Sequence, residues 1–131
     1  MELYRTICRE AAAEQVIQRS RFLAYLCPVE TQEEADGFFA RIRMEHKAAT
    51  HRVPAFLLGT KAEHQWASDD GEPQGTAGPP LLHLFAGEGL TNLAVLVVRY
   101  FGGVKLGTGG LARAYAGTAR MALEAAGRCR V

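Results

Sequence analysis

The segment Leu93–Phe101 constrains the fold most, because it is a nearly continuous apolar run that only Arg99 interrupts. A short run of this kind is typical of a central strand covered on both faces. A guanidinium at the end of a buried strand needs a carboxylate, carbonyl groups or a bound anion, unless the strand end is open to water. We therefore expect Arg99 to meet Asp69–Glu72, a dense carboxylate cluster in a predicted loop.

A glycine-rich turn follows this strand, with five glycines between Gly102 and Gly110. It leads into a long predicted helix whose buried face is formed by Leu111, Ala114, Tyr115, Thr118, Ala122 and Ala125. Glycines at a helix start suit either an anion site or a tight turn with close packing, and the sequence leaves both open. The candidate anion-binding or nucleic-acid-binding residues are Arg99, Lys105, Gly107, Thr108, Gly109, Gly110 and Arg113.

Known phosphate loops do not match this turn. A dinucleotide fold needs a further strand ending in an acid about 20 residues later, and the sequence ends at Val131. A Walker loop places its lysine after the last glycine, whereas Lys105 precedes Gly107. Both readings are therefore rejected.

The segment Ser68–Gly78 is a predicted loop that carries three carboxylates within four residues. Paired carboxylates can hold a cation or act as general acid and base, but such clusters more often order a loop through backbone N–H contacts. We favour the structural role and expect no metal site, because neither a nucleophile nor metal-ligand spacing accompanies the acids. If the chain is an enzyme, the candidate catalytic residues are Asp69, Asp70, Glu72, His46 and His51.

The remaining elements complete an α+β or α/β pattern. Phe38, Phe39 and Ile42 are expected to pack on the sheet beside Val95 and Val97. The predicted elements are one or two strands in Glu14–Val29, a helix in Thr31–Ala48 with a Thr31/Glu34 capping box, a strand at Val53–Gly59, and a short helix capped by Thr76 with Pro79 and Pro80 in its first turn.

Composition predicts one globular domain over residues 1–131, with 48% hydrophobic and 22% charged residues. The net charge is only +1, but the charges are unevenly placed. From Arg99 onward there are six bases against Glu124 alone. Three cysteines, odd in number and far apart, favour a reducing compartment and folding without a disulfide. The sequence shows no signal peptide or membrane span.

Taken together, the segments resemble the YigZ/IMPACT family over roughly residues 6–127. The matching strings are Arg19–Ala24, His46 with His51 and Ala55, Ser68–Pro73, Gly75–Gly78, Val98–Gly103, and Lys105–Leu111 with Tyr115. The resemblance implies a two-layer α+β sandwich like the second domain of ribosomal protein S5, with a four-stranded sheet and helices on one face. It also implies that the small ferredoxin-like C-terminal domain usual in bacterial relatives is absent.

The resemblance further implies a cytoplasmic regulatory domain linked to translation, whose partner is RNA or a translation-associated protein. We expect no cofactor and no membrane association. The alternative is an enzyme that acts on a phosphorylated small molecule through the glycine-rich loop. A pocket where Arg99, Lys105 and the acidic loop converge would favour the enzyme, and a flat basic face would favour binding.

Overall fold

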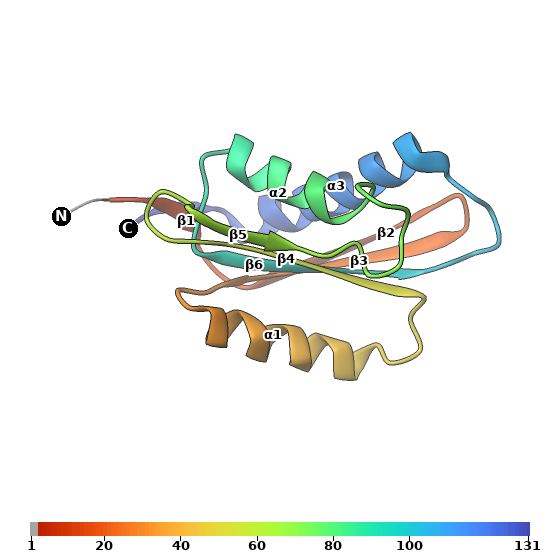
Figure 1. Cartoon of the computed structure of the whole chain (residues 1–131), viewed down its shortest axis with the longest axis horizontal. Coiled ribbons are helices and arrows are strands. Elements are labelled where there is room, and N and C mark those ends of the chain that lie inside the picture. Colours follow the sequence, from red (N-terminus) through yellow and green to blue (C-terminus); the bar gives the residue numbers. More distant parts are fainter. Residues whose placement is uncertain (1–2) are drawn as a thin grey trace.

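The computed structural model describes residues 3–131, and in this range five antiparallel strands form one sheet with helices on both faces (Figure 1). The strand order is β2-β3-β6-β4-β5, which places β6 at the centre. The elements are β1 (Arg5–Ile7), β2 (Ala11–Ile17), β3 (Ser20–Pro28), α1 (Gln32–Glu45), β4 (His51–Leu58), β5 (His64–Ala67), α2 (Gly78–Gly87), β6 (Leu93–Tyr100), α3 (Gly107–Ala126) and β7 (Arg128–Arg130).

The central strand β6 is buried on both faces, as its apolar run predicts. Alternate side chains of a strand point to opposite faces of the sheet. Val95 and Val97 therefore lie in the core beneath α2 and α3, whereas Leu96 and Val98 lie in the core beneath α1. Two separate hydrophobic cores stabilise the fold, one on each face of the sheet.

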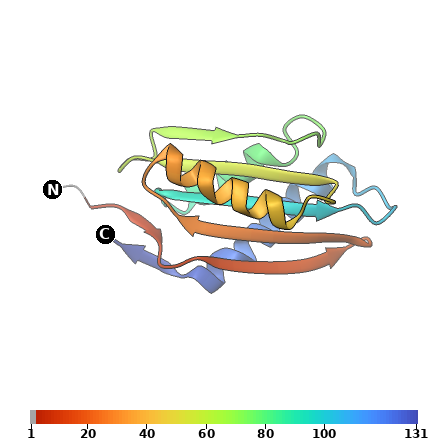
Figure 2. The ribbon, with the colours of Figure 1, turned by 90° about the horizontal axis from the view of Figure 1, so that it is seen from below.

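Helix α1 lies across one face of the sheet (Figure 2) and buries Phe38, Phe39 and Ile42 there. These side chains pack with Leu96 and Val98. The prediction that they lie beside Val95 and Val97 is wrong, because the period of two in β6 assigns those valines to the opposite core. An apolar strand covered on both sides does not indicate which residues face which helix.

The predicted α+β class is confirmed, and two details of the predicted architecture are wrong. The sheet has five strands instead of four, because β5 adds an edge strand whose residues are mostly exposed. Helices cover both faces of the sheet instead of one, with α1 opposite α2 and α3 (Figure 1). No helix within residues 3–131 has the length and apolar character needed to cross a membrane.

Helix caps follow the predictions in part. The Thr31 hydroxyl accepts from the Glu34 N–H, and the Glu34 carboxylate accepts from the N–H of Glu30. Thr76 does not cap α2, because its hydroxyl donates to the Pro73 carbonyl and Ala77 is the N-cap residue. The predicted buried face of α3 is confirmed except for Ala125, which is exposed.

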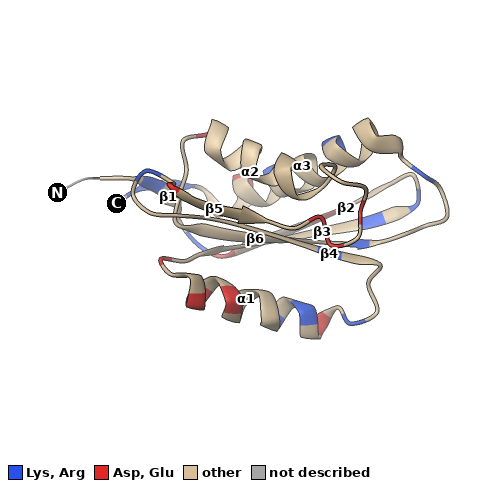
Figure 3. Ribbon diagram, viewed as in Figure 1, with Lys and Arg blue, Asp and Glu red and all other residues tan. Residues whose placement is uncertain are grey.

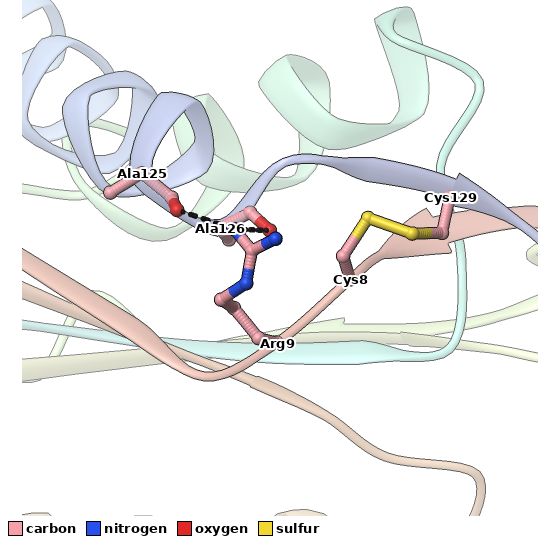
Figure 4. The surroundings of a disulfide bond; sticks show 5 residues. All are labelled: Cys8, Arg9, Ala125, Ala126 and Cys129. Carbon is pink, nitrogen blue, oxygen red and sulfur yellow. Dashed lines mark hydrogen bonds between the residues drawn. A yellow bond between two sulfur atoms is a disulfide. The ribbon is translucent and has the colours of Figure 1, made fainter.

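The two ends of the described chain are joined in a small second sheet, where β1 pairs with β7. Cys8 and Cys129 form a disulfide beside it, and the Arg9 guanidinium donates to the carbonyls of Ala125 and Ala126 at the end of α3 (Figure 4). The expectation of unpaired cysteines is therefore wrong for this pair. Spacing in the sequence gave no sign that residues 121 positions apart meet in space.

Candidate functional site

The register of β6 with its two neighbouring strands places the central residues of the site side by side. Arg99 of β6 lies opposite Phe22 of β3 and opposite His51 of β4. These three residues therefore form a row across the sheet, on the face that α2 and α3 cover. The site belongs to this row and to the loop that packs over it.

The Arg99 side chain is almost fully buried and pairs with the buried Glu72 carboxylate. Its Nη1 lies 3.0 and 2.9 Å from Glu72 Oε1 and Oε2, and its Nε donates to the Ser20 hydroxyl at 3.3 Å. The guanidinium carbon also lies 5.6 Å from the centre of the Phe22 ring and 5.3 Å from that of Phe101. The predicted contact between Arg99 and the acidic loop is confirmed.

Two further groups approach the Glu72 carboxylate. The Tyr115 hydroxyl of α3 donates to Oε2, and burial together with this hydrogen bond raises the pKa of Tyr115. The His51 Nε2 lies 3.4 Å from Oε1, while His51 Nδ1 is 2.9 Å from the Asp70 carbonyl. Because a carbonyl oxygen only accepts hydrogen bonds, Nδ1 carries a proton and donates a hydrogen bond to Asp70. The other ring nitrogen, Nε2, faces the Glu72 carboxylate. Glu72 therefore lies at the centre of a buried polar cluster that it forms with Arg99, Tyr115 and His51.

The other two acids of the loop hold its backbone. Asp69 Oδ2 accepts from the N–H of Gly75, and its Oδ1 accepts from the N–H groups of Ala77 and Gly78 at the start of α2. Asp70 Oδ2 accepts from the Arg52 N–H. The preferred interpretation, that these carboxylates order the loop, agrees with these bonds.

Asp69 makes the loop sensitive to acid. Burial raises the pKa of Asp69, but the three N–H groups outweigh it and hold the pKa below its usual value. We expect Asp69→Ala to cost about 1–2 kcal/mol at pH 7, as loss of a helix cap does. Since the pKa of Asp69 is lowered in the folded state, its contribution to stability is present above about pH 4, the pKa of an aspartate in an unfolded chain. The contribution is lost as the pH falls through the lower pKa of the folded state.

Urea unfolding of the wild type and the variant at pH 7 and pH 3 measures this difference. Asp36→Ala, which removes an exposed carboxylate of α1, is the control and should change stability by less than about 0.5 kcal/mol. A cost for Asp69→Ala that is the same at both pH values would contradict the assigned hydrogen bonds.

A pocket of about 380 Å³, called here the Arg99 pocket, lies at this cluster. It is lined by Glu72 and Arg99, by Thr50, His51 and Phe101, and by the start of α3. The predicted site residues that line it are Arg99, Glu72, His51, Lys105, Gly107 and Thr108. The pocket therefore brings together the strand end, the acidic loop and the glycine-rich turn, of which the sequence predicted the contact between the first two.

A second hollow shares Lys105 with the Arg99 pocket. It is lined by Lys105, Gly110 and Arg113 together with Gln15 and Gln18 of the β2–β3 hairpin. That hairpin turn and the loop from β6 to α3 lie at the same end of the molecule, opposite both termini (Figure 3). Lys105 is therefore shared by two neighbouring concave surfaces.

Ion pairs reduce the number of free cations in the last third of the chain. Arg99 pairs with Glu72, and both Arg120 and Arg128 pair with Glu88. Lys105 and Arg113 have no carboxylate within ion-pair distance among residues 3–131, and the same holds for Arg19 of the hairpin turn. Arg19, Lys105 and Arg113 are called here the basic end, because they lie at the β2–β3 turn and the start of α3. Other cations of residues 3–131, such as Arg130 in β7, also lack a carboxylate partner.

The glycines serve packing and turn geometry in two clear cases. A Cβ on Gly102 would lie 1.9 Å from the Arg19 carbonyl oxygen, so only glycine fits against the hairpin turn. Gly107 has φ +76°, which side chains rarely adopt, and it begins α3. No side chain caps this helix start, whose N-cap residue is Leu106. Gly109 lies in the same first turn of the helix, where anion binding stays a prediction.

His46 lies outside this site. It is the C-cap residue of α1 and forms hydrogen bonds with two tyrosines. Its Nε2 lies 2.7 Å from the Tyr25 hydroxyl, and its Nδ1 lies 2.6 Å from the Tyr100 hydroxyl. Tyr25 and Tyr100 pack in the core beneath α1, on the face opposite Arg99. Desolvation lowers the pKa of His46.

Sequence reasoning missed several residues of the site. Tyr115 was assigned to the buried face of α3 without a polar role, although a buried tyrosine hydroxyl needs a partner. Ser20 and Thr50 gave no signal, because each acts through contacts with segments distant in the sequence. Phe101 was counted as the end of an apolar strand, yet it is 45% exposed.

The fold and the site define an α+β domain with a pocket at one end of its sheet that is lined in part by the Arg99–Glu72 ion pair. The Impact N-terminal domain matches residues 18–123, so the chain belongs to the IMPACT family. YigZ of Escherichia coli is 43% identical over 110 residues, which cover 82% of this chain and 54% of YigZ. The chain spans about half the length of the curated relatives that it matches.

Two solved structures have similar folds. A crystal structure of a hypothetical protein superposes with a TM-score of 0.94 at 37% identity, over 100% of this chain and 65% of that one. The resemblance to ribosomal protein S5 domain 2 fits this architecture. The two-domain translational regulator Yih1 shares the fold, with a TM-score of 0.53 and 24% identity over 94% of this chain and 47% of Yih1.

Proposed function

We propose that the chain is a regulatory domain linked to translation, which binds RNA through the basic end. Membership of the IMPACT family and the fold shared with the translational regulator Yih1 support the link to translation. The proposal places the chain in the cytoplasm, where translation occurs. RNA is preferred to a protein partner because Arg19, Lys105 and Arg113 present positive charge that no carboxylate of residues 3–131 neutralises.

One observation carries the proposal: Lys105 lines two hollows, and Arg113 lines one of them. A strand that occupies both hollows would therefore have its phosphates close to these two cations. A surface with three such cations predicts modest, salt-sensitive binding that positions RNA without reading its sequence.

Lys105→Ala tests this proposal. We expect it to weaken binding of single-stranded RNA about equally for all sequences, and to lower the slope of log affinity against log salt by roughly 0.7 to 1. Fluorescence anisotropy at several salt concentrations measures both quantities. Arg41→Ala is the matched control, since it removes one positive charge from α1, where Arg41 pairs with Glu10.

An unchanged salt slope in Lys105→Ala would remove Lys105 from the binding surface. Absence of RNA binding by the wild type would reject the RNA proposal. The partner would then be sought among translation-associated proteins.

The Arg99 pocket favours a second candidate function, an enzyme that acts on a phosphorylated small molecule. Lys105, Arg99 and Glu72 converge there, which is the arrangement expected of a substrate pocket. The imidazole of His51 is fixed by the Asp70 carbonyl and lines the same pocket, so it is the candidate group for proton transfer, with its Nε2 beside Glu72. Turnover of phosphorylated metabolites that His51→Gln abolishes would establish this function.

A further inference from the structure

We propose that the Arg99 pocket binds a single unpaired nucleotide unit, with the base against the Phe101 ring and the phosphate beside Lys105. The inference deepens the proposed RNA binding and rests on it for the source of the nucleotide. It adds a base-binding element to a surface that would otherwise contact only phosphates.

Phe101 is the first observation. The residue is 45% exposed although it follows directly on a buried strand, and it lines the pocket. The residue is held in place, because its N–H donates to the Thr50 hydroxyl at 3.0 Å and the Arg99 guanidinium lies against its ring. A fixed aromatic ring in a pocket wall is the platform on which unstacked bases bind in single-stranded nucleic acid sites.

Charge and size agree with one nucleotide. Arg99 and Glu72 neutralise each other in the pocket lining, so Lys105 supplies the unpaired positive charge at this pocket. A phosphate complements that charge, whereas the apolar ring of Phe101 complements the base. The volume of about 380 Å³ falls in the range of about 300–1,000 Å³ typical of small-molecule sites. Paired bases are stacked inside a helix, so duplex RNA cannot offer a base to this ring.

The test compares wild type, Phe101→Ala and Phe101→Trp with three probes: single-stranded RNA, fully paired RNA and a nucleoside 5′-monophosphate. We expect Phe101→Ala to weaken single-stranded RNA binding at least about fivefold, the low end for loss of one stacked base, with an unchanged salt slope. Phe101→Trp should retain binding. Duplex affinity should be the same for Phe101→Ala and wild type. Trp66→Ala, which removes another exposed aromatic ring, is the control and should have no effect.

The outcomes separate this inference from the proposed function. If Lys105→Ala weakens RNA binding and Phe101→Ala does not, RNA binding stands and the base-binding role is overturned. If the monophosphate binds in a Phe101-dependent way and RNA does not, the pocket is a free-nucleotide site and RNA binding is overturned. If inorganic phosphate binds as tightly as the monophosphate, or if no probe binds, the nucleotide assignment is overturned.

Discussion

Replacing Arg99 by methionine is expected to cost about 3–5 kcal/mol of unfolding free energy, because it leaves the buried Glu72 carboxylate without its cation. The Tyr115 hydroxyl and His51 remain near that carboxylate, but neither replaces the two hydrogen bonds from the guanidinium. Urea unfolding at pH 7 measures the cost. Arg41→Met is the control, since it breaks a half-exposed ion pair with Glu10 and should cost less than about 1 kcal/mol.

A double-mutant cycle shows whether charge causes this loss. Glu72→Gln removes the negative charge and leaves an amide oxygen that can accept from Tyr115. The double variant Arg99→Met/Glu72→Gln should therefore be at least about 1 kcal/mol more stable than the sum of the two single losses predicts. Losses that add to within about 0.5 kcal/mol would contradict the assigned ion pair.

Phe39→Ala is expected to cost about 3–5 kcal/mol, since it empties the centre of the core beneath α1. Phe39 is 2% exposed and its ring contacts those of Phe38 and Trp66. Met44→Ala on the same helix is the control, because Met44 is 69% exposed and should change stability by no more than about 0.5 kcal/mol. Chemical denaturation of the three proteins gives the comparison. A loss below about 1 kcal/mol for Phe39→Ala would show that α1 does not bury this ring.

Local sequence signals predicted the parts of the fold that depend on neighbouring residues. The apolar run of β6 and the Thr31 cap of α1 are of this kind. The sequence did not indicate β5, because its four mostly exposed residues lack a clear alternating pattern. It also could not indicate the Cys8–Cys129 pair, which depends on strands from the two ends of the chain meeting.

The part of the candidate site that could be predicted is the ion pair of Arg99, because a buried charge must have a partner of opposite charge. A buried guanidinium needs a partner, and the nearest dense group of acids in the sequence supplied Glu72. The sequence could not predict which of the three acids pairs with Arg99. The choice depends on the loop conformation, which directs Asp69 and Asp70 to backbone N–H groups. The exposure of Phe101 likewise depends on how β6 leaves the sheet beside Arg99.

We propose that RNA binds at the end of the sheet where the β2–β3 turn lies near the start of α3. An NMR titration of ¹⁵N-labelled protein with a short single-stranded RNA tests it most directly, because backbone amides report binding residue by residue. We expect the largest chemical-shift changes at Arg19, at Arg113 and between Phe101 and Gly110. Changes centred instead on α1 and Trp66, on the opposite face of the sheet, or no changes at all, would contradict it.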